Sequence, residues 1–189
     1  MSIILASASP RRYELLKMAG IDDFKVIADT SEEIITPGLS PEDQVCKLSM
    51  QKARNIAEKC GKDDLIIAAD TLVYLDKEPL GKPDSHSDAE CMLKKLSGNK
   101  HSVYTGITII KNDRQISKAE KTDVYFRDIT GSEIKAYVET GEPMDKAGAY
   151  AIQGGAAIFA KRIEGDYYNI MGLPVCRLTM MLKEFGVRK

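Results

Sequence analysis

The sequence predicts an α/β domain with a mixed β-sheet that includes an antiparallel section. Helical and strand-like patterns alternate along the N-terminal half, "LIIAADTLVYL" at 65–75 is a continuous apolar run, and the chain becomes strand-rich from His101. No internal repeat, low-complexity tract or linker divides the 189 residues. We therefore expect one structural unit over residues 1–189, long enough to bury a substantial core.

The first two predicted elements are a buried strand at 3–6 and a helix at 10–19. Ser9 suits the N-cap of this helix and Pro10 its first position. Gly20 lies where a glycine commonly follows a helix end. Arg11 and Arg12 are not explained by capping, because cations in a first turn oppose the helix dipole. This arrangement indicates that an anion binds at the start of the helix.

The middle of the chain predicts further strands and helices in alternation. A strand is expected at 24–28, and an acidic loop then leads to a helix in "SPEDQVCKLSMQKARNIAEKC", which Ser40 and Pro41 open. Residues 65–75 form a continuous apolar run with one acid, Asp70, in the middle. A turn containing "GKP" follows it, and "SDAECMLKKL" predicts another helix.

The C-terminal half predicts the antiparallel section. "SVYTGITIIK", "RQISKAE" and "TDVYFRD" are expected as successive strands, with a turn at "KNDR". "TGSEIKAYVETG" predicts a helix capped by Thr130 or Ser132 and ended by Gly141. "GAYAIQGGAAIFAKRI" predicts two short strands around a Gly-Gly turn, and 174–185 a final helix.

Composition narrows the class of protein. With 27 basic and 28 acidic side chains, the formal net charge of −1 gives no general attraction to nucleic acid or to anionic membranes. The four cysteines form no CxxC pair, and with two histidines they give no zinc framework. No signal peptide and no apolar stretch of about 18 residues is present. We expect a soluble, intracellular protein with reduced thiols.

The strongest acidic candidate is Asp70. It follows the apolar residues 65–69, which indicate the end of a buried strand, where α/β sheets gather ligands. A turn-forming or N-capping role is an equal alternative. The pair Glu32–Glu33 lies on the loop after the second strand, and a solvated charge pair is the simpler interpretation of it.

The remaining candidates are hydroxyl and basic side chains. Ser7 and Ser9 lack the context of an activated nucleophile, so helix capping and hydrogen bonding to phosphate are preferred. Lys52, Lys82 and Lys146 are individually ordinary surface cations, and "GKP" is not a P-loop because Pro83 stands where serine or threonine is required. Together, these cations, carboxylates and a polar helix N-terminus are typical of a metal-bound polyphosphate site.

The chain resembles the Maf family along its length. The motifs that carry the resemblance are "ASASPRR", "EE", "QKA", "AADT", "GKP", "LSGNKHSVYTG", "GEPMDKAGAYAIQG" and "GDYYNIMGLP", in the family's order and spacing. The resemblance implies a nucleoside triphosphate pyrophosphatase, cytoplasmic, generally dimeric and dependent on a divalent metal such as Mg²⁺ or Mn²⁺. It also implies a fold similar to inosine triphosphate pyrophosphatases, with an elongated mixed sheet flanked by helices and a central cleft between two lobes.

The resemblance further implies a subfamily and a set of site residues. Arg12, Thr71 and Gln153 match members that act on dTTP and UTP, whereas a sister group that prefers 7-methyl-GTP carries an acid near Gln153. A glutamine amide both donates to a pyrimidine carbonyl and accepts from its N3–H, while a carboxylate only accepts. The resemblance also implies that Asp70 is the proton acceptor. On physical grounds we expect the catalytic residues to be Asp70, Lys52, Lys82 and Glu33, with Asp70 and Glu33 as metal ligands. We expect the substrate-binding residues to be Ser7, Ser9, Arg11, Arg12, Thr71, Asp145, Lys146 and Gln153.

Two other functions compete with turnover of pyrimidine nucleotides. Members of the family have been linked to arrest of septum formation, so a nucleotide-sensing regulator that binds without hydrolysis is one alternative. Nucleic-acid binding through the basic residues is the weaker one, because the net charge is near zero and no aromatic RNA-binding motif is present. We expect a homodimer that binds a nucleoside triphosphate, with no stable nucleic-acid partner and no membrane association.

Overall fold

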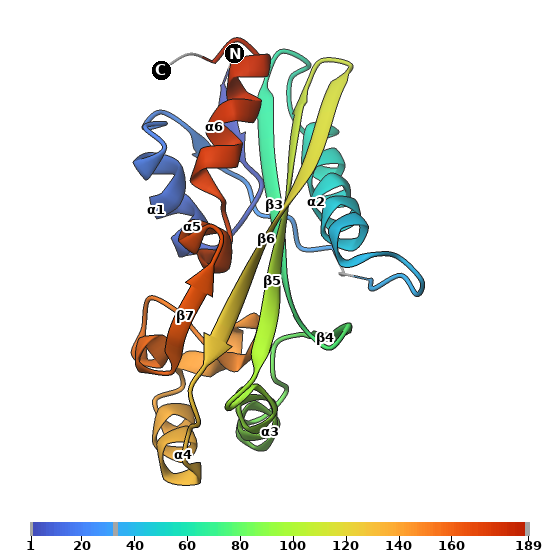
Figure 1. The fold of residues 1–189 in the computed structure, drawn as a ribbon. Helices are drawn as coiled ribbons and strands as arrows, with labels where there is room; N and C mark the ends of the chain where they lie inside the picture. The colour runs from blue at the N-terminus through green and yellow to red at the C-terminus, as the bar shows by residue number, and fades with distance from the viewer. Residues whose placement is uncertain (1, 32–33, 188–189) are drawn as a thin grey trace. The chain divides into compact units, whose positions relative to one another are not determined.

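A computed structural model of the chain describes residues 2–31 and 34–187. In this part of the chain, seven strands form one mixed sheet with the order β2-β1-β3-β5-β6-β7, and β4 pairs with β3. Helices flank the sheet, so the predicted α/β class is confirmed (Figure 1). By their internal contacts the residues form two compact units, unit 1 (1–70, 105–120 and 172–189) and unit 2 (71–104 and 121–171).

Unit 1 is built on parallel strands. β1 (Ile3–Leu5) pairs in parallel with β2 (Lys25–Val26) and with the start of β3 (Leu65–Leu75). Figure 1 shows α1 (Pro10–Met18) and α6 (Val175–Glu184) on one side of these strands and α2 (Pro41–Ala57) on the other. A helix on each side buries both faces of a parallel sheet, as the continuous apolar run of β3 predicts.

The capping residues of unit 1 act as the sequence predicts, with one exception. Ser40 is the N-cap of α2 and accepts a hydrogen bond from the backbone N–H of Asp43. Gly20 follows α1 with a φ of 78° and donates to Lys17 O. Ser9 occupies the N-cap of α1, but its side chain makes no capping hydrogen bond within the described chain.

α2 approaches the sheet closely at one glycine. Its apolar face contributes Ala53 and Ile56 to a cluster with side chains of β1 and β3. Nearer the start of the helix, a Cβ built at Gly106 of β5 (Lys100–Lys111) would lie 2.2 Å from Val45 O. This contact requires a residue without a side chain, so Gly106 sets the distance between α2 and β5.

Unit 2 contains α3 (His86–Leu96) and α4 (Gly131–Glu139), which pack against each other. Thr130, one of the two expected caps, begins α4 with a complete capping box that includes Glu133. The hydrophobic core of the unit combines these helices with strand residues such as Val73 and Phe126.

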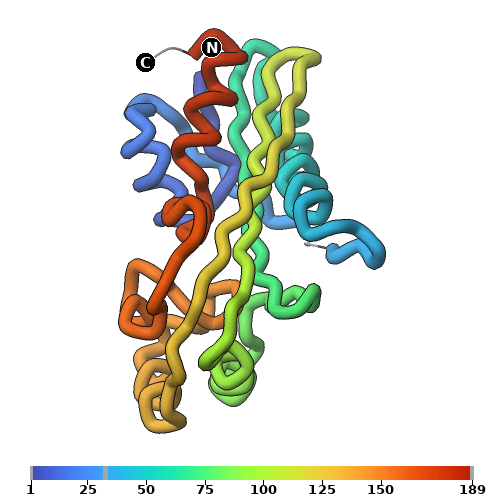
Figure 2. Tube along the Cα trace, in the orientation of Figure 1, coloured from blue at the N-terminus to red at the C-terminus, as the bar shows by residue number. Residues whose placement is uncertain are grey.

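The remaining elements show where local patterns failed. The three predicted strand segments after His101 are two long strands, β5 and β6 (Arg114–Phe126), joined at the expected turn (Figure 2, in yellow). Of the two strands predicted around the Gly-Gly turn, only the second is found, and it begins later than expected. The first part of the segment forms 3₁₀ turns at Ala147–Ala149 and Gly155–Ile158, and its end forms the strand β7 (Ala160–Glu164).

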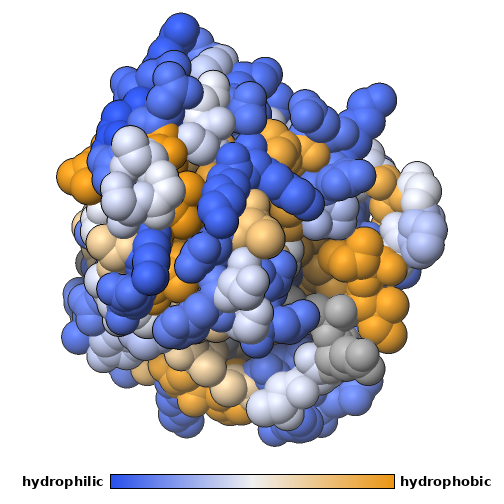
Figure 3. All heavy atoms as spheres, turned by 90° about the horizontal axis from the view of Figure 1, so that it is seen from below, coloured by the Kyte–Doolittle hydropathy of each residue, from blue (hydrophilic) through white to orange (hydrophobic). Residues whose placement is uncertain are grey.

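Two short elements were not predicted. β4 (Glu78–Leu80) pairs antiparallel with the end of β3, and α5 (Tyr167–Met171) precedes α6. No helix among the described residues has the length and apolar character needed to cross a membrane. On the face drawn in Figure 3, hydrophilic side chains cover most of the surface and apolar ones form smaller areas between them.

Candidate functional site

In unit 1, polar groups gather where three parallel strands end. Ile67 of β3 pairs with Leu5, and Ile27, just past β2, donates its N–H to Leu5 O. The parallel pairing of the three strands therefore ends at the same level of the sheet. The segments beyond this level carry Ser7 after β1, Asp29 after β2 and Asp70 in β3. Ligands of open α/β sheets bind at such carboxyl ends, as was expected for Asp70.

Asp70 is a buried carboxylate held by a lysine from the neighbouring helix. The residue is 2% exposed, and its Oδ1 accepts a hydrogen bond from Nζ of Lys52 in α2. The expectation that Asp70 ends its strand is wrong, because β3 continues to Leu75. The turn-forming and N-capping alternatives are therefore excluded, and Asp70 instead lies inside β3, three residues past Ile67, where the pairing with β1 stops.

The turn before α1 brings Ser7 and Arg12 together. Arg12 Nη1 donates to Ser7 Oγ at 3.2 Å, and Arg12 Nε donates to Gly172 O at 2.9 Å. The backbone N–H of Ser9 also donates to Ser7 Oγ, at 3.2 Å. Because a hydroxyl has two acceptor lone pairs, Ser7 can bind a further group only as a donor, which suits a phosphate oxygen.

The first turn of α1 has the polarity of an anion site. It contains Arg11 and Arg12, both half-buried, and no acidic residue. The backbone N–H groups of a first turn carry partial positive charge, and an anion there stabilises both the dipole and the two guanidinium groups. The local sequence therefore fits phosphate binding better than helix stability alone.

Asp29 is a site candidate that the sequence analysis missed. Its carboxylate accepts hydrogen bonds from Ser31 Oγ at 2.5 Å and from Asn55 Nδ2 of α2 at 3.3 Å. Burial raises the pKa of Asp29, but these bonds and the charge of Lys52 outweigh it and hold the pKa below its ordinary value. Lys52 thus acts on two carboxylates, Asp29 and Asp70. The sequence signal for Asp29 was its place at the start of the acidic loop after the second predicted strand. Only the glutamate pair of that loop was considered as a candidate.

Three further candidates lie in unit 2 on connected loops. Lys82 follows β4, and the carbonyl of its neighbour Gly81 accepts a hydrogen bond from Gly148 N at 2.9 Å. Lys146, whose side chain is 13% exposed, forms an ion pair with the exposed Asp145. The Gly81–Gly148 bond therefore joins the loop that carries Lys82 to the segment that carries Asp145 and Lys146.

Thr71 and Gln153 occupy different settings in unit 2. Thr71 lies in β3, directly after Asp70, and is half-buried. Gln153 is exposed on a turn closed by a hydrogen bond from Gly154 N to Ala151 O at 3.0 Å. Glu33, the second expected metal ligand, and its neighbour Glu32 lie outside the described residues.

The donor set of unit 1 fits a magnesium-type ion rather than a closed protein cage. The described residues contain no group of three histidine, cysteine or acidic side chains able to hold a metal. Mg²⁺ is typically bound through one or two carboxylates and completed by substrate phosphates. Asp70, a buried carboxylate in the same unit as the cationic first turn of α1, fits that pattern.

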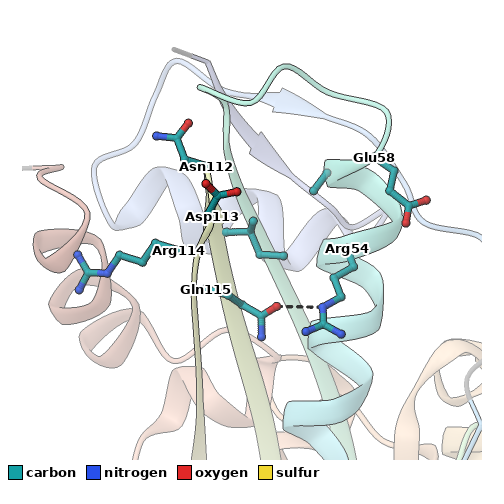
Figure 4. A pocket seen from close by; sticks show the side chains of 8 residues that line it. Arg54, Glu58, Asn112, Asp113, Arg114 and Gln115 are labelled. Atoms are coloured by element: carbon teal, nitrogen blue, oxygen red, sulfur yellow. Dashed lines mark hydrogen bonds between the residues drawn. The ribbon is translucent and has the colours of Figure 1, made fainter.

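A pocket of about 340 Å³ in unit 1 contains none of these residues (Figure 4). Arg54 of α2 and Glu58, which directly follows α2, line it on one side, and Asp113 and Arg114 of the hairpin between β5 and β6 line it on the other. Arg54 Nε donates to Gln115 Oε1 at 3.0 Å, which links the two sides. Its lining charges balance, so it offers no cationic surface for a polyphosphate.

Comparison with known proteins decides the family. A family model described as Maf-like protein matches residues 2–185. The chain belongs to the Maf family. Proteins named dTTP/UTP pyrophosphatase from Bacillus cereus (strain AH820) and Bacillus anthracis (strain CDC 684 / NRRL 3495) are each 47% identical to it, over 98% of this chain and 96% of theirs. Maf membership of the whole chain is thus confirmed.

Solved structures agree with the Maf assignment at the level of fold. The Staphylococcus aureus Ham1 protein is similar with a TM-score of 0.54 and 17% identity, covering 98% of this chain and 100% of that one. A HAM1 protein from Coxiella burnetii gives 0.53 and 16%, covering 97% and 99%. At these identities the likeness concerns the fold, which is the mixed α/β architecture described above.

Proposed function

We propose that this Maf protein hydrolyses dTTP and UTP to the nucleoside monophosphate and pyrophosphate. The observation that carries the proposal is the 47% identity, over 98% of the chain, to proteins named dTTP/UTP pyrophosphatase. The chemistry of unit 1 supports it independently, because the reaction needs cationic groups for a triphosphate and a carboxylate near the attacked phosphorus. Related modified pyrimidine nucleotides belong to the same proposed substrate class, and removal of unwanted nucleotides is the corresponding cellular role.

In this proposal, the turn before α1 binds phosphate. The Ser7 and Ser9 hydroxyls donate to phosphate oxygens, and the backbone N–H groups of the first turn of α1 that follow Pro10 do the same. Arg11 and Arg12 neutralise the charge of the chain of phosphates. The bonds from Arg12 to Ser7 and to Gly172 support this role, because they fix the guanidinium before a ligand arrives.

Asp70 is proposed to take the proton from the attacking water. An aspartate has a pKa of about 3.9 and water one of about 15.7, so the unaided transfer costs about 16 kcal/mol. A divalent ion bound by Asp70 and Glu33 would supply the Lewis acidity that lowers the pKa of water toward about 7–9, on zinc values, and the cost to about 4–7 kcal/mol. The hydrogen bond from Lys52 holds the Asp70 carboxylate in a fixed orientation for this step.

The residues of unit 2 are proposed to stabilise the charge of the leaving group and to recognise the nucleobase. Lys82 and Lys146 stabilise the negative charge that develops on the departing pyrophosphate. The ion pair with Asp145 supports a fixed position for the Lys146 ammonium. Gln153 is proposed to recognise the pyrimidine edge, with Thr71 as a further substrate contact, because an amide can donate and accept at once.

The proposal is tested by following monophosphate and pyrophosphate release from a panel of nucleoside triphosphates. The wild type is expected to prefer dTTP and UTP over purine nucleotides. Asp70→Asn should lower kcat at least about 100-fold, the usual contribution of a general base. Asp63→Asn, an equal change at an exposed residue just before β3, is the matched control and should retain activity.

Two results would contradict the proposal. One is the absence of pyrophosphate release from every nucleotide in the panel, and nucleotide binding without turnover would then favour the regulator of septum formation. The other is near-normal turnover by folded Asp70→Asn protein. Manganese binding, measured by calorimetry with a non-hydrolysable dTTP analogue, tests the metal separately and should be lost in Asp70→Asn.

Assembly and location are proposed on the family resemblance. A homodimer is expected by sedimentation equilibrium, and a cytoplasmic location by fractionation. No nucleic-acid binding is expected, and a retained oligonucleotide whose affinity falls steeply with salt would contradict that expectation.

A further inference from the structure

The turn that carries Gln153 is held on both sides by two side chains. Ala151 N donates to the Tyr137 hydroxyl at 3.1 Å. On the other side, Gly155 N donates to both carboxylate oxygens of Glu142, at 3.1 and 3.2 Å. The backbone on each side of the exposed Gln153 is therefore tied to a fixed acceptor.

The two acceptors are themselves joined. The Tyr137 hydroxyl donates to Glu142 Oε1 at 2.7 Å, so one hydroxyl both donates and accepts. Tyr137 belongs to α4, is 5% exposed, and its ring packs edge-on against Phe159 with 5.4 Å between centroids. Burial raises the pKa of Tyr137, and the bond to Glu142 raises it further, so the hydroxyl remains a donor at neutral pH.

The turn fits these side chains only because glycines follow Gln153. A Cβ added to Gly154 would lie 2.4 Å from the carboxylate oxygens of Glu142. One added to Gly155 would lie 3.1 Å from the Tyr137 ring. The Gly154–Gly155 pair thus permits close approach of the backbone to the Tyr137–Glu142 pair, rather than forming the predicted hairpin.

The backbone before the turn is also constrained. Ala149 has a φ of 58°, a left-handed conformation that is strained for an alanine. The next residue, Tyr150, is buried, and its hydroxyl pairs with His101 Nε2 at 2.9 Å. Such strain persists only where the surroundings impose the conformation, so the path of the segment into the Gln153 turn is fixed.

We propose that Tyr137 and Glu142 are positioning residues for Gln153 and, through it, set the selectivity of the protein between nucleobases. The inference rests on the proposed function, in which Gln153 recognises the pyrimidine. An amide discriminates between nucleobases only if its donor and its acceptor both meet the correct atoms of the base. If the turn that carries Gln153 can shift, we therefore expect the selectivity of the enzyme to fall before its rate of hydrolysis does.

The test compares two tyrosines that bond to glutamates in unit 2. Tyr137→Phe removes both bonds of the hydroxyl and keeps the ring. Tyr125→Phe is the matched control, because Tyr125 on β6 donates to Glu164 Oε2 of β7, also at 2.7 Å, and neither strand carries a predicted site residue. For each protein, kcat and KM are measured with dTTP, UTP and dATP.

Tyr137→Phe should reduce the ratio of kcat/KM for dTTP to that for dATP about 5-fold, the scale of one lost hydrogen bond. The change should come mainly from a higher KM for dTTP, and Tyr125→Phe should keep the wild-type ratio. Glu142→Gln keeps one side-chain oxygen as an acceptor and loses the second, so it should reduce the ratio by an intermediate amount. This variant replaces Tyr137→Phe in the test if Tyr137→Phe does not fold.

The outcomes separate this inference from the proposed function. If the wild type hydrolyses dTTP and both Tyr137→Phe and Glu142→Gln lower the unfolding midpoint without changing the dTTP/dATP ratio, the pair is structural and the inference is overturned. If the wild type hydrolyses no nucleotide in the panel, the proposed function fails and the inference falls with it.

Discussion

Buried His101 should make the stability of this protein depend steeply on pH in the mildly acidic range. The residue is 1% exposed on β5, and its ring packs edge-on against Phe126 and Tyr150. Its Nε2 pairs with the Tyr150 hydroxyl, while its buried Nδ1 has no hydrogen-bond partner among the described residues. Protonation would therefore place a charge and an unsatisfied N–H in an apolar core.

The size of this loss of stability follows from the pKa of His101. Burial lowers the pKa of His101 from 6.5 to about 4, although the charge of Asp123 opposes the shift. At 1.36 kcal/mol per pKa unit, this difference corresponds to about 3 kcal/mol. The unfolded chain binds the proton more tightly than the folded protein does. The contribution of neutral His101 to the free energy of unfolding is therefore complete above about pH 6.5 and is lost as the pH falls toward about 4.

Urea unfolding at a series of pH values measures this effect. Between about pH 7 and pH 4.5, the wild type should lose about 2–3 kcal/mol more free energy of unfolding than His101→Gln, which cannot titrate. His86→Gln is the matched control, because His86 is the other histidine of the chain and is exposed. The reasoning is refuted if His101→Gln and the wild type show the same pH dependence, or if His86→Gln removes it.

Three other substitutions test the packing, the buried ion pair and a helix cap. Gly106→Ala would press a Cβ against Val45 O and should cost about 3 kcal/mol or more in urea unfolding, and a neutral result would contradict the close approach. Lys52→Met removes the cation beside buried Asp70 and should cost about 3–5 kcal/mol at neutral pH, less in acid where the carboxylate takes a proton. Thr130→Ala should cost about 1 kcal/mol by thermal unfolding, and an unchanged midpoint would mean that the capping box adds nothing.

The sequence predicted best those features that depend on neighbouring residues. Ser40 and Thr130 cap the expected helices, because capping needs only a side-chain oxygen within one turn of the helix. The apolar residues 65–69 lie in a strand, as predicted, although that strand continues to Leu75. These local rules also located Pro10 at the start of α1.

Features that depend on distant contacts were not predictable in this way. The Gly154–Gly155 pattern resembles a hairpin, yet Glu142 and Tyr137 bind the backbone there and impose a 3₁₀ turn. Asp29 was passed over because its partner Asn55 lies in α2, far along the chain. The buried hydrogen bond between Lys52 and Asp70 joins two separate motifs, and nothing in their spacing along the sequence indicates that they lie together.

The most direct test of the central claim is the hydrolysis of dTTP in isotopically labelled water by the wild type and by Asp70→Asn. We predict that the labelled oxygen enters the monophosphate alone, because water attacks the α-phosphorus, and that the rate falls at least about 100-fold in the variant. Label in the pyrophosphate, or an Asp70→Asn rate close to that of the wild type, would contradict the claim.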